Sequence, residues 1–329
     1  MHNLIKKYTA AFSVTGREKY LADIIEKDLA PYADCISRDA MGNLIVYKKG
    51  INSEKRLMIA AHMDEIGFIV THIDDNGFIR VSNVGGISPL YSSYHNIIFE
   101  NGTKGVIVTD VSKSEVKLSD LVIDIGAKDK KEASKKVTIG DICAVAPSFT
   151  KLMGKRFTAK ALDDRIGCAV AAKAAMSDKV PAYDTYFVLT VQEEVGCRGA
   201  APATFAIKPT YGIAIDITPT GDAVGAKTMA VKLGGGAAIK LKDSGVICSS
   251  VIVNAMKEAA IKNKIAFQLE VLEAGGTDTR SIQITADGCH AGCISIPTRY
   301  THSPVECVDM GDVSACTNLL TALIYEGIE

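Results

Sequence analysis

Five short motifs in this 329-residue chain carry histidines or carboxylates, and most of them follow an apolar run. The motifs are AHMDE (61–65), LDDR (162–165), QEE (192–194), AID (214–216) and RYTH (299–302). The apolar runs before three of them, at 56–61, 185–191 and 211–215, have the composition of buried strands. Ligands of open α/β sheets bind beyond the carboxyl ends of the strands. We therefore expect one site to contain His62, Asp163, Glu193, Glu194, Asp216 and His302.

Two histidines and several carboxylates form a donor set that suits one or two divalent cations, such as zinc, cobalt or manganese. His62 and Asp64 are two residues apart, so at a strand end they lean to the same side. His62 could then bind a metal while Asp64 accepts the hydrogen of the other ring nitrogen and fixes the tautomer. Taken alone, this pair fits a strand-end turn equally well.

Two aspartates, Asp163 and Asp164, precede an Ala-rich segment at 165–176 that is predicted to be a helix. One of them is expected to serve as the helix N-cap. The other is free to bind a cation, and a carboxylate placed between two cations could hold them roughly 3.5–4 Å apart.

Glu193 and Glu194 follow the most apolar predicted strand, where buried carboxylates are costly unless cations pair with them. Adjacent residues point to different sides, so one glutamate could bind a metal while the other acts as general base. Taken alone, Asp216 would be read as a turn aspartate and His302 as a loop histidine. A role as metal ligands is favoured because the other motifs supply further candidate ligands. The segment GGTD (275–278) is either an active-site loop or a plain strand-to-helix turn.

The alternation of predicted elements divides the chain. Two helices are expected before residue 30, the second from about 17 to 29, with Ser13 or Thr15 as N-cap and Glu18 completing a capping box. Short β-like segments separated by turns fill 69–157, which predicts a small barrel or sandwich. Helix and strand alternate again afterwards. The simplest organisation is an α/β domain at 1–68 plus 158–329 with a β domain inserted.

Composition narrows the class of protein. The formal net charge is -1, so nothing favours nucleic acid or an anionic membrane as a partner. No run of about 18 apolar residues predicts a membrane span, and the N-terminus lacks a signal-peptide pattern. Nine scattered cysteines suit reduced thiols in a cytoplasmic protein. Cys289, His290 and Cys293 could form a small metal site, but no second cysteine pair completes it, and structural thiols are favoured.

The motifs together resemble the cytosolic two-metal aminopeptidases, the family that includes glutamyl aminopeptidase and the tetrahedral TET aminopeptidases, with some members labelled endoglucanases. The resemblance covers nearly the whole chain, and it runs in order through SVTGRE (13–18), MGNL (41–44), AHMDEIGF (61–68), ALDDRIG (161–167), QEEVGCRGA (192–200), GGTD (275–278) and IPTRYTHSP (296–304). It implies a mixed-sheet α/β/α metallopeptidase domain with an inserted β-barrel. It also implies peptide substrates with a free N-terminus, dimers formed through the inserted domain, and assembly into a hollow dodecamer.

The resemblance also implies roles for single residues. One metal would be held by His62 and Glu194, the other by Asp216 and His302, and Asp163 would bridge them. Glu193 would be the general base and acid, and Asp64 would orient His62. The two cations would be zinc or cobalt, with manganese as a further option.

Three other interpretations stay open at this point. Another amide hydrolase on the same core, such as a deacylase or carboxypeptidase, would use the same residues. A metal-free glycoside hydrolase would need only two carboxylates, although the chain has no tryptophan and only 6% aromatic residues for sugar stacking. A binding protein with a relic site would be expected to have lost at least one ligand, and here the set is complete.

Overall fold

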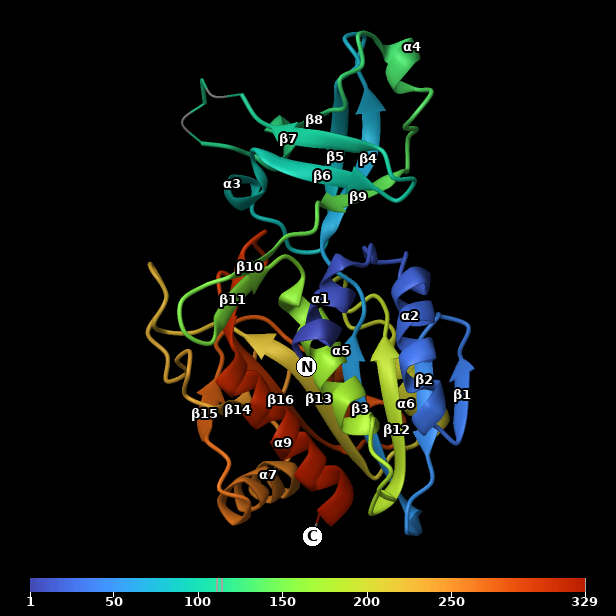
Figure 1. The fold of residues 1–329 in the computed structure, drawn as a ribbon, viewed down its shortest axis with the longest axis vertical. Coiled ribbons are helices and arrows are strands. Elements are labelled where there is room, and N and C mark those ends of the chain that lie inside the picture. The colour runs from blue at the N-terminus through green and yellow to red at the C-terminus, as the bar shows by residue number, and fades with distance from the viewer. Residues whose placement is uncertain (111, 114, 329) are drawn as a thin grey trace.

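The apolar runs that precede the acidic motifs form neighbouring strands of one large mixed sheet (Figure 1). Within the residues that the computed structural model describes, 1–110, 112–113 and 115–328, this sheet has 11 strands. They are β1 (Cys35–Arg38), β2 (Leu44–Lys48), β3 (Asn52–His62), β10 (Phe149–Lys151), β11 (Arg156–Ala159), β12 (Tyr183–Thr190), β13 (Tyr211–Thr218), β14 (Ala237–Lys242), β15 (Phe267–Val271), β16 (His290–Arg299) and β17 (Glu306–Asp309). The order is β1-β2-β12-β3-β13-β16-β17-β11-β10, and β14 and β15 branch from β16.

The four central strands, β12, β3, β13 and β16, run parallel to one another. His62 ends β3 directly beside Thr190 at the end of β12, and Asp216 lies near the end of β13. The parallel arrangement therefore brings the AHMDE, QEE and AID motifs to the same edge of the sheet, as the sequence predicted.

Helices cover both faces of this sheet. The helices are α1 (His2–Ala10), α2 (Lys19–Leu29), α5 (Leu162–Ala175), α6 (Ala200–Ile207), α7 (Ser250–Lys262), α8 (Thr279–Ile284) and α9 (Met310–Glu326). Leu57 and Ile59 of β3 share a core with α1, α2, α5, α7 and α9, whereas Met58 and Ala60 pack with α6 and α8 on the other face. Alternate strand residues thus point into two cores, which makes three layers and confirms the α/β/α prediction.

The β-rich middle of the chain closes into a small barrel, so of the two predicted forms the barrel is confirmed. Its strands, in the barrel order β4-β5-β8-β7-β6-β9, are β4 (Gly67–Ile73), β5 (Ile79–Val84), β8 (Val122–Asp124), β7 (Lys104–Val108), β6 (His95–Phe99) and β9 (Ile142–Val145). Two short helices, α3 (Pro89–Ser92) and α4 (Lys130–Ala133), accompany it. The barrel stands beyond the carboxyl ends of the central strands (Figure 1), and β10, which follows it, returns to the main sheet by pairing with β11.

One local prediction is wrong. The helix expected at about 17–29 is α2, but the capping box does not form, because Glu18 occupies the N-cap position without a side-chain cap. The Thr15 hydroxyl instead donates to Asp64 Oδ2 at 2.8 Å, and Glu18 Oε1 accepts from the backbone N–H groups of Gly16 at 2.7 Å and Gln192 at 3.2 Å. The side chains of Thr15 and Glu18 therefore bond to the AHMDE and QEE motifs and do not cap the helix. None of the described helices is long and apolar enough to cross a membrane.

Candidate active site

Asp163 lies at the centre of the carboxylates and histidines that the sequence singled out. Its Oδ1 is 3.0 Å from Nε2 of His62, and its Oδ2 is 3.2 Å from Nε2 of His302. His62 reaches it from the end of β3, and His302 reaches it from the turn between β16 and β17. The two oxygens of one buried carboxylate therefore face two different histidines.

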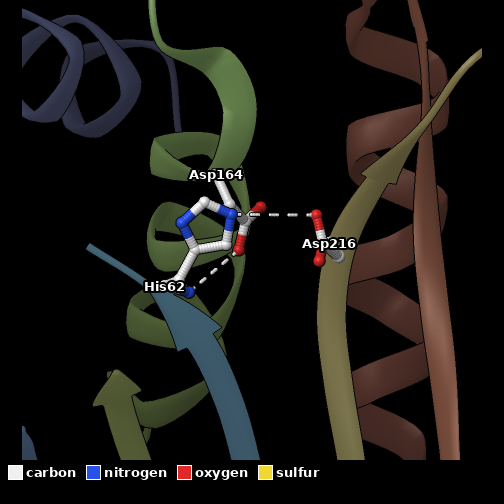
Figure 2. A group of neighbouring side chains, drawn as sticks. All are labelled: His62, Asp164 and Asp216. Carbon is white, nitrogen blue, oxygen red and sulfur yellow. Dashed lines mark hydrogen bonds and ion pairs between the residues drawn. The ribbon is translucent and has the colours of Figure 1, made fainter. Parts of the chain in front are cut away.

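Glu194 and Asp216 complete this arrangement on opposite sides. Glu194 Oε2 is 3.5 Å from Nε2 of His302, while Asp216 Oδ1 is 4.0 Å from Nε2 of His62. Figure 2 shows the Asp216 carboxylate on β13 facing the His62 ring at the end of β3. We refer to the assembled side chains as the five-residue cluster; its members are His62, Asp163, Glu194, Asp216 and His302.

Hydrogen bonds at the other ring nitrogens fix both histidines. His302 Nδ1 is 2.7 Å from the backbone oxygen of Gly86, and His62 Nδ1 is 3.2 Å from the backbone oxygen of Asp64 and 3.4 Å from its Oδ1. Because these oxygens can only accept, each Nδ1 carries a hydrogen. Both Nε2 atoms are thereby directed at Asp163 as the atoms that a cation would use.

Asp164, the neighbour of Asp163, has a structural role. Its Oδ1 accepts from the Gly167 backbone N–H at 3.0 Å, as an N-cap does, and its Oδ2 accepts from the His62 backbone N–H at 3.2 Å, as Figure 2 shows. A Cβ on Gly167 would lie 2.1 Å from Asp164 Oδ1, so any other residue there would have to displace this carboxylate. Asp164 thus has the capping role that the sequence led us to expect for one of the two aspartates, while the carboxylate of Asp163 faces the two histidines.

Besides its contact with the His62 ring, the Asp64 carboxylate accepts hydrogen bonds from the backbone of the QEE motif. Its Oδ1 accepts from the Glu193 backbone N–H at 3.0 Å, and its Oδ2 accepts from the Glu194 backbone N–H at 3.2 Å as well as from Thr15. One fully buried carboxylate thus ties the end of β3 to the segment that carries both glutamates.

Sequence reasoning missed two buried glutamates: Glu306, which contacts the cluster, and Glu65, which pairs with two buried cations. Glu306 Oε2 accepts from the Asp163 backbone N–H at 3.0 Å, and its Oε1 accepts from the His302 backbone N–H at 2.8 Å. Glu65 lies between Lys160 and Arg165, with its nearest oxygens 2.5 Å and 3.1 Å from their nitrogens. The sequence signal for both is a carboxylate inside or just after an otherwise apolar strand, which demands a buried partner.

The electrostatics show that the cluster lacks positive charge. Burial, followed by repulsion from Asp163, raises the pKa of Glu194 well above its ordinary value; burial and the same neighbour also raise the pKa of Asp216. Burial would likewise raise the pKa of Asp163, but the bonds with His302 and His62 outweigh it and hold that pKa low. Burial opposes protonation of His302, yet the carboxylates around it raise its pKa to about 11. The site therefore attracts protons or cations.

Divalent cations fit this donor set well. Imidazole nitrogen and carboxylate oxygen are both ligands of zinc, and the five-residue cluster contains no cysteine. Ligand atoms of His62, Asp163 and Glu194 lie within 4.8 Å of one another, as do those of His62, Asp164 and Asp216. The oxygens of Asp164 already accept backbone hydrogens, so Asp163 is the better donor to a cation.

A cavity of about 730 Å³ opens onto the cluster. Glu193 and all five cluster residues line it, and so do residues 271–277. The GGTD segment is a strand-to-helix turn with Asp278 at the N-cap position of α8, and its Gly275 and Gly276 line the cavity, so the prediction of an active-site loop stays open. Away from the cavity, Cys289 and Cys293 are free thiols, and the ring of His290 pairs with Ser249 at 3.1 Å.

Comparison with known proteins agrees with this architecture. Residues 42–319 match the family described as M42 glutamyl aminopeptidase. The chain is 46% identical to a putative aminopeptidase of Acetivibrio thermocellus, over 98% of each chain. It superposes on the aminopeptidase APDkam598 of the archaeon Desulfurococcus kamchatkensis with a TM-score of 0.95, at 36% identity over 99% of this chain and 94% of that one. It also superposes on the TET1 peptidase of Pyrococcus horikoshii, which can assemble into a tetrahedron or a large octahedral shell, with a TM-score of 0.87, at 34% identity over 99% of each chain.

These matches span the fold and all the motifs that build the site. The chain belongs to the M42 family of metal-dependent glutamyl aminopeptidases, and it is a peptide hydrolase.

Proposed function

We propose that this enzyme removes N-terminal residues from peptides with two divalent cations held by the five-residue cluster. The observation that carries the proposal is the position of Asp163, whose two oxygens face the Nε2 atoms of His62 and His302. A carboxylate in this position is suited to bridge two cations. Protons and metal cations compete for the same carboxylate oxygens. The raised pKa values of Glu194 and Asp216 mean that a nearby positive charge, from a proton or a cation, stabilises these buried groups.

The contacts favour a different assignment of ligands from the one implied by resemblance. His62 lies nearer to Asp216 across the sheet edge, and His302 lies nearer to Glu194. We therefore assign His62 and Asp216 to one cation and Glu194 and His302 to the other, with Asp163 shared. The set of five ligands is unchanged, and only the pairing differs.

When bound, the two cations would polarise the scissile carbonyl and lower the pKa of the attacking water. Glu193 lines the same cavity, and burial raises the pKa of its carboxyl above the ordinary value. A carboxylate with a raised pKa is a better proton acceptor at neutral pH. Glu193 would take the proton of the water and pass it to the leaving amine, while Asp64 holds the Glu193 backbone and the His62 ring in place.

The cluster also explains a requirement for a free N-terminus. With the cations bound, the free α-amino group of a peptide would sit beside one of them and the carboxylates that line the cavity, which restricts cleavage to N-terminal residues. A deacylase or carboxypeptidase would instead accept a blocked N-terminus, which gives a direct distinction.

The test is hydrolysis of aminoacyl-p-nitroanilides of Glu, Asp, Leu, Lys and Ala after EDTA treatment, with and without zinc, cobalt or manganese. We expect cleavage only when metal is restored, and the panel will identify the preferred residue. Cleavage of N-acetylated peptides in place of peptides with a free N-terminus would contradict the aminopeptidase assignment. Cleavage that survives EDTA treatment would contradict the requirement for divalent cations.

Glu193→Gln tests the general base. The amide keeps the shape of the side chain but cannot accept the proton, so kcat should fall by about 100-fold or more. The manganese content of the five-residue cluster, measured by atomic absorption, should be unchanged because Glu193 is not one of its five proposed ligands. Substantial turnover in this variant would contradict its role.

We further propose that residues 69–157 form an oligomerisation domain inserted into a catalytic domain made of 1–68 and 158–329. The support is the separate barrel in Figure 1 and the assembly of the Pyrococcus horikoshii relative into closed shells. Light scattering with metal present should report a dimer or dodecamer, and a monomeric mass would contradict the proposal. The nine free cysteines support a reducing, cytoplasmic location.

A further inference from the structure

A second group of metal-binding side chains lies on the cavity wall, next to the proposed base and outside the five-residue cluster. It consists of Glu193, Cys197 and Asp278. The Cys197 thiol donates to Glu193 Oε1 at 3.0 Å, and one ligand atom from each of the three residues lies within 4.8 Å of the other two. Glu193 and Cys197 both line the cavity, so a solute that enters it can reach them.

Asp278 shows independently that this group lacks a partner. Its side chain is only 3% exposed, and its Oδ2 accepts from the Thr190 hydroxyl at 2.6 Å. Its Oδ1 is buried and has no hydrogen-bond partner among the described residues. A buried, unpaired carboxylate oxygen is costly, so a proton or a cation is expected there. Burial, with the charge of Glu193 adding to it, raises the pKa of Asp278 to about 7.

We propose that Glu193, Cys197 and Asp278 form a third cation site, selective for thiophilic divalent ions such as zinc and cadmium. One sulfur and two oxygens are accepted zinc ligands, and a water from the cavity can take the fourth position. Around a tetrahedral zinc the ligand atoms lie about 3.3–3.8 Å apart, as bond lengths of roughly 2.0–2.3 Å require. The three ligand atoms, which lie within 4.8 Å of one another, would have to draw together to that size when a cation binds.

The sulfur makes this site different from the five-residue cluster. Burial, followed by the charge of Glu193, raises the pKa of the Cys197 thiol, so without a soft cation the thiol stays protonated. Binding exchanges the thiol proton for the cation: the S–H bond breaks, a sulfur–metal bond forms and one proton leaves to solvent. Thiophilic ions displace that proton readily, whereas magnesium and manganese prefer sites made only of oxygen and nitrogen.

Occupation of the third site would inhibit the enzyme. This consequence rests on the proposed function, because Glu193 is the proposed general base, and an oxygen bound to a cation cannot accept a proton from water. Zinc would then support activity at low concentration through the five-residue cluster and inhibit it in excess through Glu193, Cys197 and Asp278. Manganese would support activity without the inhibitory phase.

A direct test of the site does not depend on activity. Cadmium is titrated into the manganese-loaded full-length enzyme, and the ultraviolet charge-transfer absorption of a cadmium–thiolate bond is recorded. The five-residue cluster has no sulfur and gives no such band. We expect the band in the wild type and in Cys289→Ser, a control that removes a half-buried thiol away from the cavity, and we expect its loss in Cys197→Ser. A band of equal size in Cys197→Ser, or no band in the wild type, would overturn the proposal.

The inhibition is tested with the same variants, each normalised to its own rate without excess zinc. Loss of an outer partner of a metal ligand commonly costs 10–100-fold in affinity, so loss of a ligand should raise the zinc concentration for half inhibition at least about tenfold. Cys197→Ser keeps a hydroxyl that can donate to Glu193, and Asp278→Asn provides a second variant if the first fails to fold. Inhibition that is equal in all variants would refute the site. Absence of aminopeptidase activity would refute only the proposed function, because the cadmium band would still decide whether the site exists.

Discussion

At the scale of single residues, Glu306 is the most instructive support of the cluster. It binds the backbone N–H groups of both Asp163 and His302, so it sets the distance between the proposed bridging ligand and one histidine. Glu306→Gln replaces one acceptor oxygen by an amide that cannot accept. We expect cation affinity, measured by isothermal titration calorimetry, to fall about 10–100-fold, as for other outer partners of metal ligands.

The matched control for Glu306 is Glu26→Gln, the same substitution on the exposed side of α2, where Glu26 pairs with Arg38. It should leave cation affinity unchanged. Activity of Glu306→Gln should recover at saturating metal, because no ligand or base has been removed. Unchanged affinity in Glu306→Gln would show that the two N–H groups are held without it.

The sequence predicted that the candidate ligands and the candidate base meet at one site, and it singled out Asp64 beside His62, but it gave no indication of Glu306. His62, Asp163 and Glu193 stand at strand ends or a helix start, where local pattern predicts their position. Glu306 acts on two N–H groups that meet only through the fold. The pairing of His62 with Asp216 depends likewise on which strands are neighbours, and motif spacing contains no such information.

At the scale of elements, the site depends on a close approach between the barrel and the main sheet. The segment after β5 brings Gly86 so near to His302 that a Cβ on the glycine would lie 3.0 Å from Nδ1. Gly86→Ala should therefore displace the His302 ring or weaken its bond to the Gly86 oxygen. We expect weaker cation binding, measured by calorimetry, with a small change in the melting temperature.

Gly102, a glycine of the barrel away from the site, provides the control for Gly86→Ala. Gly102 has φ of +85°, and a Cβ added there would meet no atom within 4 Å, so Gly102→Ala strains the backbone without touching the site. It should lower the melting temperature and leave cation affinity intact. If Gly86→Ala binds cations as well as the wild type does, the contact with the barrel does not position His302.

The elements also show where local signals fail. The helix at 17–29 was predicted from periodicity and is observed as α2, which buries one apolar face, whereas the helix at 165–176 was predicted from its alanine content and is observed as α5, which is buried on nearly all sides. The capping box at Thr15 and Glu18 was a local prediction, and it is wrong because both side chains have buried tertiary partners. Polar residues beside a functional site are recruited by that site, so capping rules are least reliable there.

At the scale of the whole molecule, strand order was the part that the sequence did not predict. Alternating elements indicated an α/β domain with an inserted β domain, since both follow from local period and spacing, and the family resemblance implied the mixed sheet and the barrel. The branch at β16, where β14 pairs on one side and β17 continues the sheet, arises from long-range pairing. This branch nevertheless shapes the cavity, because residues 271–277, at the end of β15 and just after it, line the same cavity as the cluster.

The buried acids and histidines of the site make the stability of the whole molecule depend on pH and on cations. The folded state raises the pKa of Asp278 to about 7 and of Glu306 to about 8, from 3.8 and 4.5, in both cases mainly by burial. Between pH 5 and about 8 the folded protein therefore binds more protons than the unfolded chain, so its stability falls as the pH rises. His302, with its pKa raised to about 11 from 6.5, acts in the same direction above about pH 6.5.

We therefore expect the melting temperature of the EDTA-treated protein, measured by differential scanning calorimetry, to fall steadily from pH 5 to pH 8. Zinc or manganese should flatten this dependence, because cations take the place of the protons at the same donor atoms and bind more tightly as the ligands deprotonate. The stabilisation by metal should consequently be larger at pH 8 than at pH 5. A metal-free melting temperature that rises over this range, or one that cations leave unchanged, would mean that the buried carboxylates are neutralised by another route and that the cluster is not a cation site.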